Sequence, residues 1–203
     1  MFRKIFDHYG IEQPKLVFNE KTSSQLTASG CSQGHIKMLR MAKFKRWDYV
    51  VIFEDDACPC LNWKEVFNNA LNEIPLDTWE CLKLETTNVF REMYPNGCHD
   101  ITNYWYKKYW CPGFPSCGSA AYVVSKRGID KFLIEYAVNS RAIADIVINS
   151  VSNENFYYIK SPIFLQQDLH GSEKLQYTGN NCVSYKGLWG ENVWDEDFSW
   201  LKN

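Results

Sequence analysis

A run of five apolar residues, Tyr49–Phe53, leads directly into three consecutive carboxylates, Glu54, Asp55 and Asp56. An unbroken apolar run of this length is typical of a strand that is buried on both faces of a parallel sheet. Apolar residues at helical spacing precede it over 32–46 and follow it from position 63. This alternation predicts an α/β fold with a mostly parallel central sheet and helices on its faces. Ligands bind such sheets at the carboxyl ends of the strands, where the three carboxylates lie.

The rest of the chain continues the same alternation and predicts a single domain over residues 1–203. Residues 87–117 are rich in aromatic residues, Pro, Gly and Asn, and predict a long aromatic loop, which in a compact domain is functional or partly structured. Beyond about residue 168 the pattern fades into an irregular C-terminal tail. Further strands are predicted at 15–18, 81–85, 119–124 and 156–160, and further helices after Ser125, which can cap the first of them, and around 141–151.

Charge and hydropathy exclude several classes of partner. The net charge is −2, without the basic excess or stripe that nucleic-acid binders show. No segment reaches the roughly 18 apolar residues that a membrane span needs, and the first residues lack the apolar core of a signal peptide. We therefore expect a cytoplasmic protein without a membrane span, for which peripheral membrane contact remains open. In that compartment the eight cysteines are expected as reduced thiols rather than as a disulfide framework or a zinc site.

The three adjacent carboxylates favour a divalent cation. Like charges at a strand's end raise each other's cost of ionisation, and a cation removes that cost. Mg²⁺ and Mn²⁺ take oxygen ligands, commonly one or two carboxylates together with substrate phosphates. Alternation along an extended segment places Glu54 and Asp56 on one side and Asp55 on the other. An exposed acidic turn fits the three residues taken alone equally well.

Two ordered blocks of sequence resemble glycosyltransferase family 25, which includes bacterial lipooligosaccharide galactosyltransferases and collagen galactosyltransferase domains. The first is "GCSQGHIKMLRMAKFKRWDYVVIFEDDA", in which Gly30, Cys31 and His35 match, while Gly34 stands where the family usually has Ser. The second is "GSAAYVVSKRGIDKFL" followed by "AIADIVI", in which Tyr122, Ser125, Gly128 and Asp145 match. A closing segment, "SPIFLQQDLHGSEK", matches through Pro162, Gln167 and Ser172, so the resemblance covers roughly residues 28–174.

The resemblance implies a Rossmann-like GT-A domain that uses Mn²⁺ or Mg²⁺ and a nucleotide-sugar donor, most simply a UDP-sugar. It implies Asp56, Glu54 and His170 as metal ligands, although His170 also fits an ordinary loop histidine. The family's first nucleotide-binding strand would precede this chain, because "FRKIFDHYGI" resembles the helix after it. That strand is then missing or replaced. The donor pocket would take Glu54, Asp55, His35, Ser119 and Tyr122, with His35 equally readable as a structural histidine.

The resemblance also implies inversion at the anomeric carbon, which needs one general base to take the acceptor's proton. Asp145 matches the family's Asp, although a surface carboxylate of a helix fits it too, and Asp100 and Asp168 are weaker alternatives. The predicted function is transfer of a hexose to a glycan or glycoconjugate acceptor, in lipopolysaccharide or other glycan biosynthesis. Two alternatives stay open: a non-catalytic carbohydrate-binding or scaffold module, which the aromatic segments fit, and a metal-dependent phosphodiesterase.

Overall fold

The computed structural model describes residues 27–54, 57–59, 63–75, 77–85, 98–108, 119–139, 143–152, 154–160 and 163–166. Four of the residues considered above as ligands or bases, Asp55, Asp56, Asp168 and His170, lie outside these ranges. The predicted strand at 15–18 and the tail beyond 168 also lie outside them.

The described chain contains both helices and strands, as the hydrophobic periodicity predicts, but they alternate only in part, because four strands follow one another between residues 81 and 125. Every helix and strand predicted within the described residues is present, with bounds that shift by a few residues. The elements are α2 (Thr27–Lys45), β1 (Tyr49–Phe53), β2 (Ala57–Pro59), α3 (Trp63–Asn72), β3 (Cys81–Lys83), β4 (Cys98–Asp100), β5 (Trp105–Lys108), β6 (Ala121–Ser125), α5 (Lys126–Val138), α6 (Ala144–Val151), β7 (Phe156–Ile159) and β8 (Phe164–Gln166).

Six strands form one open mixed sheet in the order β1-β6-β3-β7-β5-β4, and β2 pairs with β8 in a separate two-stranded sheet. Within the six-stranded sheet only β3 and β7 pair in parallel; the other four pairings are antiparallel. The prediction of a mostly parallel sheet is therefore wrong for the described strands. The reason is non-local: β6 inserts between β1 and β3 with the opposite direction, and β4–β5 adds a hairpin beside β7.

The strand directions nevertheless bring together the carboxyl ends of several strands, where the site was predicted. Because β1 and β3 both run antiparallel to β6, they point the same way, and β7 runs parallel to β3. The carboxyl ends of β1, β3 and β7 therefore meet at one edge of the sheet.

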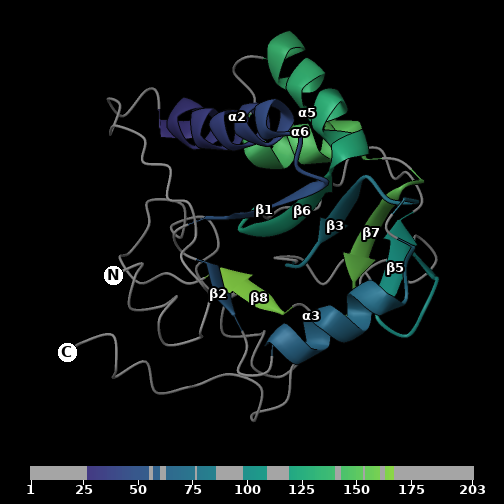
Figure 1. The fold of residues 1–203 in the computed structure, drawn as a ribbon. Helices are drawn as coiled ribbons and strands as arrows, with labels where there is room; N and C mark the ends of the chain where they lie inside the picture. Colours follow the sequence, from purple (N-terminus) through teal and green to yellow (C-terminus); the bar gives the residue numbers. More distant parts are fainter. Residues whose placement is uncertain are drawn as a thin grey trace.

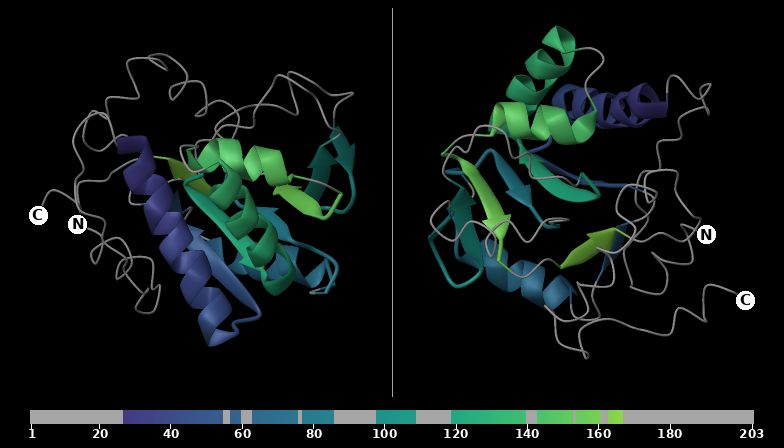
Figure 2. Two further views of the ribbon diagram at one scale, coloured as in Figure 1. Left: turned by 90° about the horizontal axis from the view of Figure 1, so that it is seen from above. Right: turned by 180° about the vertical axis from the view of Figure 1, so that it is seen from behind.

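Three layers build the molecule, with helices on both faces of the sheet (Figures 1 and 2). Helices α2, α5 and α6 cover one face, while α3 and the β2–β8 pair lie against the other. Val50 and Ile52 of β1 are buried in the hydrophobic core on the face that α2, α5 and α6 cover. Val51 and Phe53 pack against the core on the opposite face, beneath α3 and the β2–β8 pair. The continuous apolar run is thus explained by burial against both layers.

Helix α5 lies unusually close to the segment that leads into β3. A Cβ on Gly128 would lie 2.5 Å from the carbonyl oxygen of Glu80, so only glycine fits this approach. Ser125 occupies the N-cap position as predicted, but it makes no side-chain hydrogen bond to its helix. Its hydroxyl instead donates to the carbonyl of Trp79 at 2.7 Å, which ties the start of α5 to the chain before β3.

The predicted long loop over 87–117 is partly structured, because β4 and β5 form a hairpin within it. The indole N–H of Trp105, which is fully buried, donates to the carbonyl oxygen of Ala70 in α3 at 2.7 Å. This bond joins the hairpin to the helix on the same face of the sheet.

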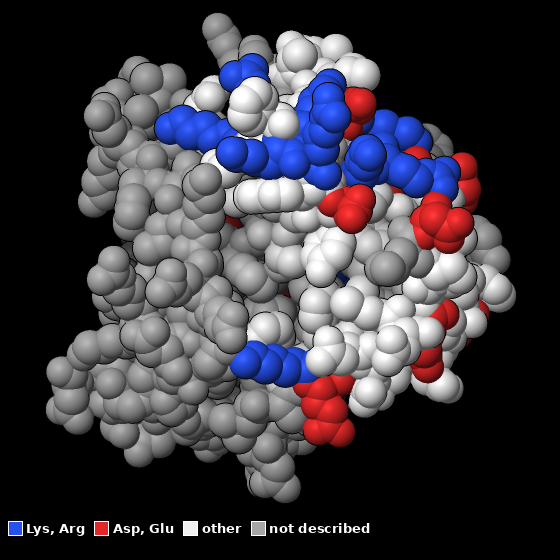
Figure 3. All heavy atoms as spheres, in the orientation of Figure 1, with Lys and Arg blue, Asp and Glu red and all other residues white. Residues whose placement is uncertain are grey.

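Lysine and arginine side chains gather over α2 and the start of α5 (Figure 3). On α5 the cluster begins directly after β6, and on α2 it continues to the end of the helix. The exposed members of this basic face are Lys37, Arg40, Lys43, Lys45, Arg46, Lys126, Arg127 and Lys131.

Among the described helices, none combines the length and apolar composition that crossing a bilayer requires.

Candidate functional site

Glu54 directly follows β1 at the edge where the carboxyl ends of β1, β3 and β7 meet. Its backbone N–H donates to the carbonyl oxygen of Ala120 at 2.8 Å, which prolongs the pairing with the strand next to it. Its own carbonyl oxygen accepts from the N–H of Ala57 at 3.1 Å, so the chain turns sharply after β1. The backbone of this carboxylate is therefore fixed on both sides.

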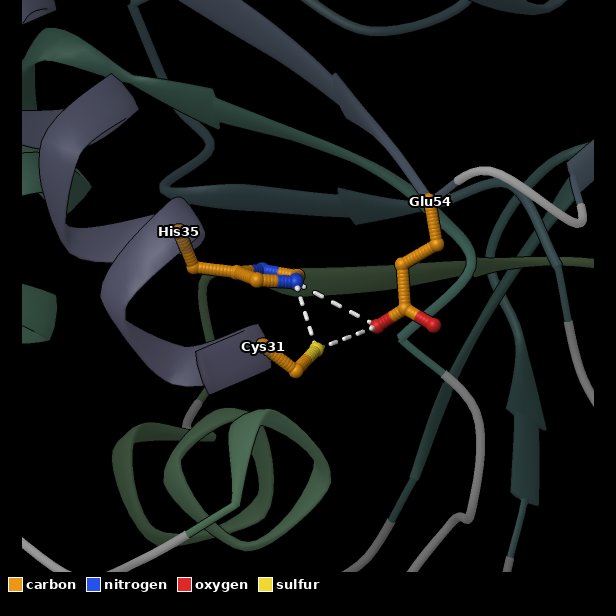
Figure 4. A group of neighbouring side chains, drawn as sticks. All are labelled: Cys31, His35 and Glu54. Carbon is orange, nitrogen blue, oxygen red and sulfur yellow. Dashed lines mark hydrogen bonds and ion pairs between the residues drawn. The ribbon is translucent and has the colours of Figure 1, made fainter. Parts of the chain in front are cut away.

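The side chain of Glu54 turns toward α2 and is nearly enclosed, with 12% of its surface exposed (Figure 4). Its Oε1 atom lies 3.2 Å from Nε2 of His35 and 3.4 Å from Sγ of Cys31. The Ser119 hydroxyl donates to the same oxygen in a short hydrogen bond. One carboxylate oxygen thus receives contacts from three side chains, two from α2 and one from Ser119, which lies two residues before β6.

His35 is held from both of its ring nitrogens. Its Nε2 also lies 3.4 Å from Sγ of Cys31, one helical turn earlier in α2, and its Nδ1 lies 2.6 Å from the hydroxyl of Tyr122 in β6. The two rings stack with 5.6 Å between their centroids. Such contacts fix the orientation of the imidazole and leave Nε2 directed at Glu54.

Behind this group lie two buried tyrosines. Burial raises the pKa of Tyr122 well above its usual range, and the nearby Tyr136 and Cys81 add to the effect. Burial likewise raises the pKa of Tyr136, and Cys31, Glu54 and Asp145 raise it further. Both phenols therefore stay protonated near neutral pH, so the Tyr122 hydroxyl is able to donate its proton to His35.

Asp145 stands in the first turn of α6, half-buried, on the side of the sheet that α2, α5 and α6 cover. It lies close enough to act on the pKa of Tyr136 but makes no direct contact with Glu54 that the described residues show. Its Oδ1 atom is buried without a hydrogen-bond partner among the described residues. A buried carboxylate oxygen of this kind is able to accept a proton donor from a bound molecule.

A second ionic pair is buried at the end of β3. Lys83 and Glu85 are both fully buried, with Nζ and Oε2 3.7 Å apart. Lys83 is in register with Tyr122 of β6, and Leu84 bonds to the backbone of Ala121. The backbone N–H of Glu54 bonds to Ala120, the residue before Ala121. The Lys83–Glu85 pair therefore lies at the same end of the sheet as Glu54.

The structure brings together four of the residues predicted from the resemblance: His35, Glu54, Ser119 and Tyr122. In the part of the chain that the structure describes, Asp145 makes no hydrogen bond or ion pair to these four residues, but it lies close enough to Tyr136 to raise the pKa of that residue. The alternative base Asp100 belongs to β4, at the opposite edge of the sheet from β1, and pairs with Lys160 at 3.0 Å. Asp100 is therefore too far across the sheet to act with Glu54.

Three residues of this region were not predicted as site residues: Cys31, Lys83 and Glu85. The spacing of Cys31 and His35, four residues apart on a helix, is a signal for two side chains on one face. Lys83 and Glu85 interrupt an apolar strand segment, which is a signal for a buried pair. The first signal does not name Glu54 as the third member of the group, and the second does not place the Lys83–Glu85 pair near Glu54; only the fold supplies both.

A separate cavity lies on the α3 side of the sheet, and no predicted site residue lines it. Its volume is about 350 Å³. It is lined by Tyr49, Phe67, Asn68, Leu71, Asn72, Trp79 and Val123.

The described side chains also bear on the predicted metal. Cys31, His35 and Glu54 offer one sulfur, one nitrogen and one oxygen ligand, all within 4.8 Å of one another. Mg²⁺ and Mn²⁺ prefer oxygen ligands, so a site for them depends on the carboxylates that follow Glu54.

No protein-family model matches the chain, and a search of curated proteins finds no match.

Proposed function

We propose that the protein transfers a hexose from a nucleotide diphosphate sugar, most simply a UDP-sugar, to a glycan or glycoconjugate acceptor, with inversion and with a divalent metal. The observation that supports this proposal is the meeting of His35, Glu54, Ser119 and Tyr122 at the carboxyl end of β1. The resemblance assigns these residues to one donor site, although they come from segments up to 87 residues apart.

The strand directions support the fold that this function requires. We infer that β1, β3 and β7, which point the same way, are the parallel part of a Rossmann-like sheet of the GT-A type. In this interpretation β6 is an inserted antiparallel strand. The two residues before β6 then close the donor site beside Glu54, since Ser119 and Ala120 both bond to that residue.

The chemistry needs a cation at the diphosphate and a base at the acceptor. A bound Mn²⁺ or Mg²⁺ stabilises the negative charge that develops on the leaving phosphate. Glu54 and Asp56, with His170, are the residues that would hold it. Ser119 and His35 orient the Glu54 carboxylate, and the buried Tyr122 fixes the His35 ring from behind.

Asp145 is the proposed base. The acceptor hydroxyl oxygen attacks the anomeric carbon while the bond from that carbon to the diphosphate oxygen breaks. The hydroxyl proton passes to Asp145, and the nucleoside diphosphate leaves with the electrons of the broken bond. The unpartnered Oδ1 atom, as far as the described residues go, fits a base that waits for a hydroxyl donor.

The basic face of α2 and α5 suits an acceptor presented at an anionic surface. Eight exposed cationic side chains lie on these two helices and the residue after α2. Each Lys or Arg near an anionic membrane contributes about 1 kcal/mol of attraction. A lipid-linked glycan acceptor is therefore consistent with this face.

The test is turnover of a panel of UDP- and GDP-sugars with Mn²⁺, with and without EDTA. Asp56→Ala should abolish metal-dependent turnover. Asp145→Asn should keep donor affinity and lower transfer by about 10²- to 10⁴-fold, the usual contribution of a general base. Asp130→Asn is the matched control, because Asp130 is an exposed carboxylate on α5 paired only with the exposed Lys43 among the ion pairs seen.

Absence of both donor binding and metal-dependent turnover across the panel would overturn the proposal. Binding of sugars without turnover would favour the carbohydrate-binding alternative instead. Hydrolysis of simple phosphodiesters in place of sugar nucleotides would favour the phosphodiesterase.

A further inference from the structure

The Cys31–His35–Glu54 group has the dimensions of a tetrahedral metal site. We propose that these three side chains bind Zn²⁺. In proteins Zn²⁺ lies about 2.3 Å from sulfur, about 2.0–2.1 Å from imidazole nitrogen and about 2.0 Å from carboxylate oxygen. At tetrahedral angles these lengths place the nitrogen and oxygen about 3.3 Å apart, and the sulfur about 3.5 Å from each of them.

The observed edges agree with these values. Nε2 of His35 and Oε1 of Glu54 are 3.2 Å apart, and Sγ of Cys31 is 3.4 Å from each of the two atoms. The three atoms therefore form one face of a tetrahedron of the right size, with one corner left for water, a substrate atom or a further ligand. Three protein ligands with an open position are the pattern of catalytic zinc sites.

The donor set selects zinc over Mg²⁺ and Mn²⁺. Thiolate and imidazole are soft or borderline ligands that suit Zn²⁺, whereas Mg²⁺ and Mn²⁺ suit carboxylate, carbonyl and water. A zinc ion here engages Oε1 of Glu54, so the diphosphate-bound ion of the proposed transfer would be held by the other carboxylate oxygen of Glu54 together with Asp56 and His170. The two sites therefore share Glu54, while the zinc site depends only on the geometry of Cys31, His35 and Glu54.

The residues around the three ligands also have the arrangement of a metal site. Metal-binding histidines usually donate their second ring N–H to an oxygen, and ligating carboxylates accept hydrogen bonds. Nδ1 of His35 faces the Tyr122 hydroxyl at 2.6 Å, and Ser119 donates to Glu54. With zinc bound, Nδ1 carries the proton and donates it to the Tyr122 oxygen.

Without a metal, this group has more hydrogen-bond donors than its carboxylate oxygen can accept. In a metal-free cluster Oε1 of Glu54 faces three potential donors, which are the Cys31 thiol, the Nε2 atom of His35 and the Ser119 hydroxyl. A carboxylate oxygen has about two lone-pair sites, so one of the three donors exceeds them. Replacing the Cys31 and His35 protons by one cation removes this excess.

The test is a metal titration of the full chain, reduced with a phosphine and stripped with a chelator. Zn²⁺ is titrated against a chromophoric chelator, and Co²⁺ serves as a spectroscopic substitute. We expect one tight site, a thiolate-to-cobalt charge-transfer band and visible bands of tetrahedral intensity. Cys31→Ser should lose the charge-transfer band and bind zinc more than about 100-fold more weakly, since even outer-shell partners contribute 10- to 100-fold.

Cys98→Ser is the matched control, because Cys98 is a half-buried cysteine outside any disulfide, in β4 at the far edge of the sheet. It should leave both affinity and spectrum unchanged. Tyr122→Phe should keep the cobalt band and weaken binding about tenfold, as expected for a residue that orients a ligand. His35→Gln, checked for folding by circular dichroism, provides a second test of the ligand set.

Failure of the wild-type chain to bind stoichiometric zinc would overturn this proposal. So would a Cys31→Ser variant that keeps the wild-type affinity and cobalt band, because the thiolate would then come from another cysteine. Neither assay contains a sugar nucleotide, so the zinc site and the proposed transferase activity stand or fall separately.

Discussion

Replacement of Lys83 by Met should destabilise the protein strongly while keeping the side chain's length. Lys83 and Glu85 are fully buried, and their charged atoms are 3.7 Å apart. At an effective dielectric constant of about 20 this separation corresponds to about 4.5 kcal/mol of attraction. Removal of one partner leaves the other charge buried, which typically costs about 3–5 kcal/mol. We therefore expect a loss of about 3–5 kcal/mol in the free energy of unfolding.

A double variant separates the charge effect from packing. Lys83→Met combined with Glu85→Met should recover most of the loss, because replacing both members of a buried pair by apolar groups is often neutral. Lys43→Met is the matched control: its pair with Asp130 is 60% exposed on both sides, so we expect a change below about 1 kcal/mol. Urea denaturation with a common m-value gives all three differences.

The single variant should unfold at a lower urea concentration than wild type at every pH at which both proteins fold, because the buried pair is incomplete. A single variant within about 1 kcal/mol of wild type, or a double variant no more stable than the single one, would refute this account of the pair.

Three further outcomes are expected. Gly128→Ala should lower the free energy of unfolding by about 1–3 kcal/mol, although alanine has the better helix propensity. The reason is that the new methyl group meets the backbone oxygen of Glu80 at 2.5 Å. Thermal unfolding measures the effect, and an unchanged melting temperature would contradict it. Burial raises the pKa of Cys81 to about 12, so iodoacetamide near pH 8 should label this thiol only after unfolding. Peptide mass spectrometry of native and denatured samples tests this labelling. The contribution of the protonated Cys81 thiol to the free energy of unfolding should be lost as the pH rises from about 9 toward 12. Trp105→Phe should cost about 0.5–1.5 kcal/mol, because the Ala70 carbonyl loses the indole donor but keeps the N–H of Glu73. Equal denaturation midpoints for variant and wild type would show that the indole bond contributes nothing.

Local periodicity predicted the elements of the described chain well. The helix at 32–46, the strand at 48–53 and the helix after Ser125 all occur within a few residues of their predicted bounds. These patterns reflect which face of each element is buried, and neighbouring residues along the chain carry that information. The same rule did not find β8, because three residues are too few to show a period.

The directions of the strands were not predictable in this way. Strand–helix alternation implies parallel neighbours, but β6 enters the sheet between β1 and β3 and reverses two pairings. Pairing of β6 with both strands depends on contacts about 40 to 75 residues apart, as the registers Cys81↔Val124 and Tyr49↔Ser125 show. No local pattern encodes such a choice.

The candidate site shows the same division. The resemblance placed His35, Glu54, Ser119 and Tyr122 in one site, and the structure brings them together. Cys31 was left out because its significance depends on Glu54, which is 23 residues away in sequence and 3.4 Å away in space.

By itself the sequence determined the periodic elements and the position of the carboxylates at the end of a buried strand, since both follow from neighbouring residues. Only the tertiary structure decided that Glu54 turns toward α2 and joins Cys31 and His35 rather than facing solvent. The physical reason is that β1, β6 and α2 pack together, so that the fold brings the three side chains to within 4.8 Å and encloses them. The grouping of Cys31, His35 and Glu54 is therefore a property of the packing, while the acidic run is a property of the sequence.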